Sequence, residues 1–143
     1  MGITKNMNCP ICETPMIVLE LDQVEVDHCR KCGGVWLDPE EMDLLLEGSA
    51  GRDEIRANLK WGEASEEKTR RCPICRHKME KARVRRKDTA PGVQIDRCER
   101  GHGTWLDGGE LQAIVALSEF PEAHRIHAFL QSVFRDTIRE PRA

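Results

Sequence analysis

The chain is poor in aromatic residues and has no long apolar run. Its 143 residues include no Tyr, three Phe and three Trp, so a large aromatic core is excluded. No stretch approaches the roughly 18 consecutive apolar residues of a membrane span, and residues 1–8 lack the apolar run of a secretory signal. Neither sign of charge dominates, because 22 basic and 25 acidic side chains leave a net charge of −3. We expect a cytoplasmic protein.

Cysteine is the residue that this short chain has in unusual number. There are seven. Reducing compartments keep thiols reduced, so paired cysteines there more often hold a metal than form disulfides. An odd count also does not suit a closed set of disulfides. The cysteines are therefore predicted to be metal ligands.

The sequence contains an internal repeat. The motif Cys-Pro-Ile-Cys occurs at residues 9–12 and again at residues 72–75, and residues 27–38 match residues 96–107. The offset between the copies grows from 63 to 69 residues, so six residues are inserted between the two clusters of the second copy. An insertion with both ends kept in register predicts a longer hairpin between two fixed metal-binding turns.

The spacing of the ligands predicts two metal sites. The first copy reads Cys-x2-Cys, sixteen residues, Cys-x2-Cys, which delivers four soft ligands as two pairs. In the second copy Gly101 stands in the place of Cys32, and His102 follows one residue later. An imidazole is longer than a thiol, so the extra residue is sterically reasonable. Seven Cys and one His then fill two tetrahedral zinc sites.

The remaining histidines are not predicted to be ligands. His28 and His77 lie beside ligand pairs that are already complete, so we expect them to surround the sites or to face solvent. His124 and His127 lie three apart in a helical segment without a carboxylate pattern, and no metal role is predicted for them.

The segments between the ligand pairs predict a small metal-stabilised α+β fold. Residues 16–21 and 24–28, and residues 82–87 and 93–96 of the second copy, read as extended segments around a turn. Each copy is thus a zinc ribbon, in which a hairpin connects two metal-binding turns. We call each of these turns, with its pair of ligands, a knuckle. A unit of this size buries too little apolar surface to fold alone, so zinc must supply much of the folding free energy.

Each ribbon is expected to lead into a capped helix. Asp38 and Asp107 are predicted N-caps, with Glu41 and Glu110 three residues later. Capping explains these carboxylate pairs better than acid–base catalysis does. Trp36 and Trp105 are predicted to pack over their own sites, and the alternative is that they form exposed platforms for bases.

The predicted organisation has four parts. These are ribbon 1 with its helix (1–48), a helical and charged linker (49–71), ribbon 2 with its helix (72–118) and a C-terminal amphipathic helix (119–143). The last begins at Pro121 and has Ile126, Leu130, Val133, Phe134 and Ile138 at helical spacing. Its apolar stripe packs either on a ribbon or on a second subunit.

The motifs resemble those of the bacterial TFIIB-type zinc-ribbon family. They are Cys-Pro-x-Cys, then Cys-x2-Cys-Gly-Gly-x-Trp-Leu-Asp with a Glu three residues later, and copy two resembles a Cys3His variant of this pattern. The resemblance implies a transcription-related or zinc-binding protein that carries two zinc ions. The implied ligands are Cys9, Cys12, Cys29 and Cys32 for the first ion, and Cys72, Cys75, Cys98 and His102 for the second.

Charge is distributed unevenly between the copies. Residues 1–47 carry three basic and ten acidic side chains, whereas residues 68–100 carry twelve basic and four acidic ones. Arg83, Arg85 and Lys87 alternate along one extended segment and would share a face, with Arg86 beside them. These four are candidate contacts for a partner protein, for self-association or for nucleic acid. A protein contact is favoured, since no Tyr or Phe on that hairpin offers a stacking surface.

These observations predict a non-enzymatic double zinc-ribbon protein that mediates macromolecular interaction. Neither membrane binding nor a small-molecule substrate is predicted. The alternative is a redox protein with a rubredoxin-like iron centre or a dithiol switch, because Cys32-Gly33 after a Cys-x2-Cys pair resembles the rubredoxin knuckle. A zinc hydrolase is disfavoured, since catalytic zinc usually has three protein ligands and an open position.

Overall fold

The computed structural model describes residues 7–21, 24–62, 68–86, 92–122 and 124–136. Within these ranges the chain forms six short strands and four helices. No helix in this part is both long enough and apolar enough to cross a membrane. The arrangement is α+β, as predicted, and its strands form one antiparallel sheet.

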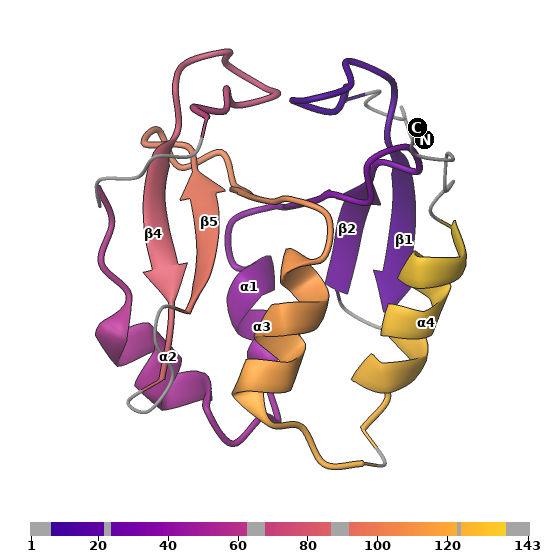
Figure 1. The fold of residues 1–143 in the computed structure, drawn as a ribbon, viewed down its shortest axis with the longest axis vertical. Coiled ribbons are helices and arrows are strands. Elements are labelled where there is room, and N and C mark those ends of the chain that lie inside the picture. The colour runs from indigo at the N-terminus through magenta and orange to yellow at the C-terminus, as the bar shows by residue number, and fades with distance from the viewer. Residues whose placement is uncertain (1–6, 22–23, 63–67, 87–91, 123, 137–143) are drawn as a thin grey trace.

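The two ribbons share a single sheet. Ribbon 1 supplies β1 (Ile17–Leu21), β2 (Val24–His28) and β3 (Val35–Leu37), and ribbon 2 supplies β4 (Glu80–Val84), β5 (Val93–Arg97) and β6 (Thr104–Leu106). The strand order is β1-β2-β3-β6-β5-β4, so the ribbons join through the antiparallel pair β3–β6. Trp36 lies directly opposite Trp105 in this pair. The copies are therefore related by an approximate two-fold axis, which runs vertically in Figure 1.

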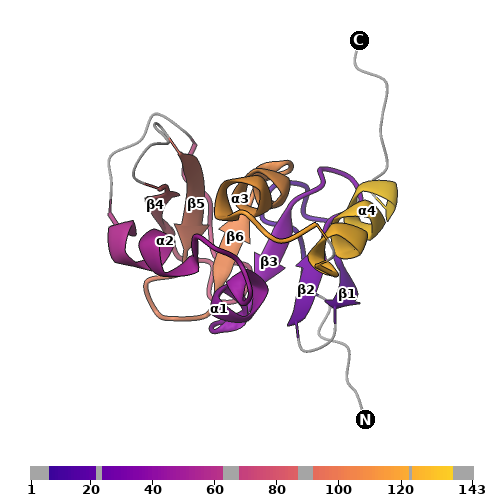
Figure 2. The ribbon, with the colours of Figure 1, turned by 90° about the horizontal axis from the view of Figure 1, so that it is seen from below.

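The helices exchange places between the copies. The first helix after each ribbon, α1 (Glu41–Leu46) or α3 (Glu110–Ser118), packs on its own hairpin, α1 against β2 and α3 against β5. The second helix crosses over. Figure 2 shows α2 (Arg52–Asn58) beside the β4–β5 hairpin of ribbon 2 and α4 (Ile126–Asp136) beside the β1–β2 hairpin of ribbon 1. Each ribbon is thus covered partly by a helix from the other copy.

Strand alternation separates two apolar clusters. One face of the sheet packs on the helices, and its buried residues include Val26, Val35, Leu37, Ile95 and Leu106. The other face carries the two paired tryptophans, which pack with buried cysteines of both copies. In Figure 1 the helices lie below the central strands and both pairs of knuckles lie above them. The sheet therefore separates the main core from the predicted metal sites.

The six inserted residues lie in the connection of the second hairpin. Both hairpins have strands of five residues, and the connection is residues 22–23 in ribbon 1 but residues 85–92 in ribbon 2. The prediction that Arg83 and Arg85 share one face of a strand is wrong, because β4 ends at Val84. Lys87, the third member of that group, lies outside the described residues.

The predicted helix caps are also corrected. The N-cap residues are Glu40 and Gly109, both in the left-handed region, and neither helix has a side-chain cap. The two aspartates instead begin a turn before each helix, where Glu41 accepts the backbone N–H of Asp38 and Glu110 accepts that of Asp107. Only the glutamate half of the capping box is therefore formed.

The C-terminal helix packs on ribbon 1. Ile126 and Phe129 are buried in the main core, and α4 contacts β1. The helix begins at Ile126 rather than at Pro121, and ahead of it the chain turns where the His124 N–H bonds to the Pro121 carbonyl. Of the remaining predicted stripe, Ile138 lies outside the described residues.

A buried ion pair distinguishes ribbon 2 from ribbon 1. Lys81 Nζ lies 2.6 Å from Asp96 Oδ2, and the side chains are 9% and 1% exposed. The position of Lys81 in ribbon 1 is held by the exposed Val18. The pair lies in the same cross-strand row as the tryptophans.

We expect Asp96→Asn to lower the free energy of unfolding by about 3 kcal/mol, because it removes the negative charge that lies 2.6 Å from a buried ammonium. Urea denaturation of the zinc-loaded protein measures this change. The double variant Lys81→Met/Asp96→Leu should recover most of the loss, since it removes both charges. A double variant no more stable than Asp96→Asn would contradict this account.

Candidate metal centres

Each copy brings four ligand groups together. The ligand atoms of each group lie within 4.8 Å of one another, and the two groups are Cys9, Cys12, Cys29 and Cys32, and Cys72, Cys75, Cys98 and His102. A zinc tetrahedron with Zn–S bonds of about 2.3 Å has sulfurs about 3.8 Å apart. The Sγ atoms of Cys9 and Cys32, and those of Cys75 and Cys98, are each 3.6 Å apart. Both groups therefore fit one zinc ion each.

The imidazole of His102 completes the second site. Its Nδ1 atom lies 3.4 Å from Cys98 Sγ and 3.7 Å from Cys72 Sγ. In both groups the first member of each ligand pair is buried and the second is partly exposed. Each group would thus hold its ion between the core and the surface, with four protein ligands.

The first knuckle of each copy is closed by the same turn. Glu13 and Arg76 occupy equivalent positions with φ values of 59° and 66°, and their N–H groups donate to the carbonyls of Cys9 and Cys72. The backbone N–H groups of Ile11 and Ile74 donate to the Sγ atoms of these cysteines, both at 3.3 Å. Amides that point at sulfur stabilise the thiolates that zinc requires.

The second knuckles explain why a histidine replaces a cysteine. In ribbon 1 the left-handed residue is Gly33, whose N–H bonds to the carbonyl of Cys29 four residues earlier. In ribbon 2 the left-handed residue is Gly101, at φ 82°, whose N–H bonds to the carbonyl of Cys98 only three residues earlier. The position of the missing cysteine therefore has a backbone that favours glycine. The ligand moves one residue along the chain, to His102.

Hydrogen bonding lowers the pKa of one thiol in each cluster. The pKa of Cys9 is lowered to about 5, chiefly by its contact with the Cys32 thiol and further by backbone N–H groups. The backbone N–H of His77 lowers the pKa of Cys75 to about 6. Burial raises the pKa of Cys12 and Cys72 to about 11. Cys9 and Cys75 are thus the more easily ionised thiols, whereas Cys12 and Cys72 need the metal to displace their protons.

Both tryptophans connect the two sites. Neither side chain is exposed, so the alternative of stacking platforms for bases is wrong. A Cβ atom at Gly34 would lie 2.3 Å from the Trp105 ring, and one at Gly103 would lie 2.5 Å from the Trp36 ring. Each indole therefore lies against the second knuckle of the other copy and not only over its own site. The two metal sites share one apolar cluster.

The other histidines have structural contacts. His28 is fully buried, and its Nδ1 lies 3.2 Å from the carbonyl of Gly34. His77 is exposed, with Nδ1 3.1 Å from the carbonyl of Cys75 and Nε2 3.0 Å from Arg100. His124 Nδ1 accepts the N–H of Ile126, and His127 Nε2 lies 3.1 Å from the carbonyl of Pro121.

The three described residues among the predicted basic contacts differ in their surroundings. Arg83 lies in β4 and Arg85 follows it, and both are partly exposed. Arg86 points inward, where it pairs with Glu54 at 3.2 Å and Glu119 at 2.8 Å. It therefore ties the second hairpin to α2 and to the end of α3.

Two features of the sites escaped the sequence reasoning. One is the pair of glycines, Gly34 and Gly103, that accommodate the exchanged indoles. Their repetition at the same place in both copies was the available signal. The other is the bond from Trp105 Nε1 to Asp107 Oδ1 at 2.7 Å, which gives one predicted capping residue a different role.

Comparison with known proteins agrees with this geometry. A family model described as Transcription factor zinc-finger, of the TFIIB zinc-ribbon type, matches residues 8–48 and 71–117, more than half of the chain. The comparisons with curated proteins and with solved structures found no match. The two matched segments each contain one complete group of four ligands. The chain belongs to the Transcription factor zinc-finger family of TFIIB-type zinc ribbons, and it carries two copies and two zinc ions.

Proposed function

We propose that this protein is a non-enzymatic interaction module in which zinc is a scaffold, working in the reducing cytoplasm. The observation that carries the proposal is the complete set of four protein ligands at each ion. A hydrolytic zinc needs an open position for water, and these sites offer none once all four ligands bind. The family description adds transcription as the setting in which a partner would be met.

The knuckle ends supply a contact surface. Ile11 and Ile74 occupy the same place in the two Cys-Pro-Ile-Cys turns, and they are 39% and 44% exposed. Both pairs of knuckles lie at the same end of the molecule, at the top of Figure 1. We call the surface of the two isoleucines and the exposed Arg30, Arg76 and Arg100 the knuckle face. Its apolar tips and basic side chains suit a protein partner with an acidic surface.

Capture by crosslinking in the native cell tests this surface. We expect Ile11→Asp/Ile74→Asp to abolish the crosslinked complexes of the wild-type chain, because it puts charge at both apolar tips. The matched control is Val18→Asp, since Val18 is 47% exposed on β1 and is not part of the knuckle face. Equal capture by all three proteins would reject the knuckle face as the contact surface.

Nucleic acid is the second candidate partner, because Arg83, Arg76 and Arg100 are at least partly exposed on ribbon 2. The buried tryptophans and the inward Arg86 weaken this candidate, since they remove stacking and charge from the contact. A gel shift at low salt that is lost in Arg83→Glu/Arg100→Glu would favour it. No shift at low salt would remove it.

A further inference from the structure

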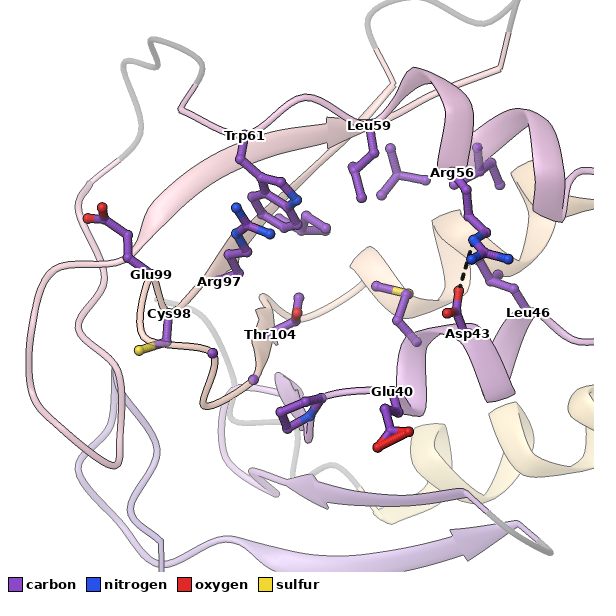
Figure 3. A pocket seen from close by; sticks show the side chains of 17 residues that line it. Glu40, Asp43, Leu46, Arg56, Leu59, Trp61, Arg97, Cys98, Glu99 and Thr104 are labelled. Atoms are coloured by element: carbon purple, nitrogen blue, oxygen red, sulfur yellow. Dashed lines mark ion pairs between the residues drawn. The ribbon is translucent and has the colours of Figure 1, made fainter.

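A cleft opens in the ribbon 2 half of the molecule, apart from the isoleucine tips of the knuckle face. Its volume is about 470 Å³, and it lies between α1, α2 and strands β4 to β6, as Figure 3 shows. Its apolar walls are formed by Met42, Leu46, Ile55, Leu59, Trp61 and Ile95. A concave apolar site of this size is large enough to bury a substantial ligand group.

The two-fold relation identifies an equivalent surface in the other half of the molecule, and that surface is buried. The cleft residues Met42, Arg97 and Thr104 are partly exposed. Their counterparts in the other half, Leu111, His28 and Val35, are at most 2% exposed.

In that half, helix α4 lies beside the β1–β2 hairpin and contacts β1. This helix has eleven residues against seven in α2, and its Phe129 is buried in the core beside ribbon 1. Helix α2 has no aromatic residue, and Trp61, which follows it, forms part of the cleft wall, so among the described residues no side chain fills the cleft. The half in which this surface is buried therefore also has a buried phenylalanine, on the helix that lies beside its ribbon.

Charge on the rim indicates what lies next to that group. The Arg97 guanidinium stacks on Trp61 at 4.2 Å and donates to Glu80 at 2.7 Å, so its charge is matched inside the protein. Arg56 is likewise paired with Asp43, at 3.4 Å. The exposed Glu40 and Glu99 make no ion pair within the described residues, and Figure 3 shows them at separate places on the rim. The rim therefore attracts cations.

We propose that this cleft is a docking site for a phenylalanine side chain of a partner protein, flanked there by lysine or arginine. The aromatic ring lies between the apolar walls, and the basic neighbours pair with Glu40 and Glu99. Glu99 lies next to Arg100 of the knuckle face, but neither isoleucine lines the cleft, so Ile11→Asp/Ile74→Asp tests the knuckle face without changing the cleft.

The test uses a defined probe and the full-length, zinc-loaded protein. The peptide acetyl-Lys-Lys-Phe-Leu-Lys-Lys-amide is titrated into ¹⁵N-labelled protein. The reporters are the indole N–H of Trp61 and the amide of Thr104, since both residues line the cleft. We expect saturable shifts of these two signals with the probe. Peptides with Ala in place of Phe, or with Glu in place of the four Lys, should produce none at the same concentration.

Variants of the protein separate rim charge from total charge. Glu40→Lys/Glu99→Lys should weaken binding of the probe about fivefold at low salt, because two exposed charge pairs are lost. The matched control Glu20→Lys/Glu122→Lys changes two exposed acids outside the cleft and should leave binding unchanged. Ile11→Asp/Ile74→Asp should also leave it unchanged. Shifts that miss the cleft, equal binding of the Glu peptide or equal weakening by both double-lysine variants would each overturn the proposal.

Discussion

Replacing Cys29 by serine is expected to release zinc from the first site and to unfold more than ribbon 1. Structural zinc contributes about 10–16 kcal/mol to the folding of zinc-finger peptides, which exceeds the stability of a typical small domain. Cys29 is fully buried, so a serine there also leaves an unsatisfied polar group near the tryptophans. The wild-type chain should be colourless and contain two zinc ions. A red, iron-loaded chain would instead indicate the rubredoxin-like redox protein.

The loss should extend to ribbon 2, because the two sites are not separate units. Trp105 lies against the knuckle that Cys29 begins, and β3 pairs with β6 across the centre of the sheet. Native mass spectrometry should therefore find weakened zinc binding at the intact second site, by at least about tenfold, which corresponds to about 1.4 kcal/mol of lost coupling. Cys98→Ser should weaken the first site in the same way. Full affinity at the remaining site in both variants would show that the ribbons fold independently.

Replacing Gly34 by alanine is expected to lower the free energy of unfolding by about 3 kcal/mol, at the upper end for an overpacked core. The new methyl group would lie 2.3 Å from one ring atom of Trp105 and 2.5 Å from another. It would also lie 3.0 Å from the carbonyl oxygen of Leu106, so a rotation of the ring alone does not make room. Urea denaturation with zinc in excess measures the change.

A control and a second substitution identify the contact as the cause. Gly109→Ala adds a methyl group with no atom within 4 Å but at φ 92°, so it should show only backbone strain of about 1 kcal/mol. Trp105→Leu should lower the free energy of unfolding by less in the Gly34→Ala background than in the wild type, because the smaller side chain removes the clash. Additive effects of Gly34→Ala and Trp105→Leu would contradict a direct contact between the copies.

The proposed cleft and the exchanged helices have a common origin in the repeat. Each ribbon exposes an apolar surface that a helix from the other copy must cover, and the two covering helices differ in length and in aromatic content. The longer helix α4 covers its surface, and the shorter helix α2 leaves part of its own open. Divergence between two copies of one unit has thus produced a different surface on each half.

The metal chemistry and the local units could be predicted from the residues alone. Cys-x2-Cys spacing, the shift from Cys32 to His102 and the repeated hairpins are short-range features, because a knuckle turn brings its two ligands together within a few residues. Strand periodicity likewise placed the hairpin β1–β2 and the position of the insertion. The helix caps were misplaced, since the left-handed conformation of Glu40 is held by a turn that no capping pattern predicts.

Only the tertiary structure decided how the copies combine. The pairing of β3 with β6, the exchange of Trp36 and Trp105, and the crossing of α2 and α4 all join residues far apart in the sequence. Local periodicity shows that a face is apolar, but it does not identify the surface that covers it. That choice depends on shape and packing across the whole molecule, and it is what makes two zinc ribbons one sheet with a cleft on one side.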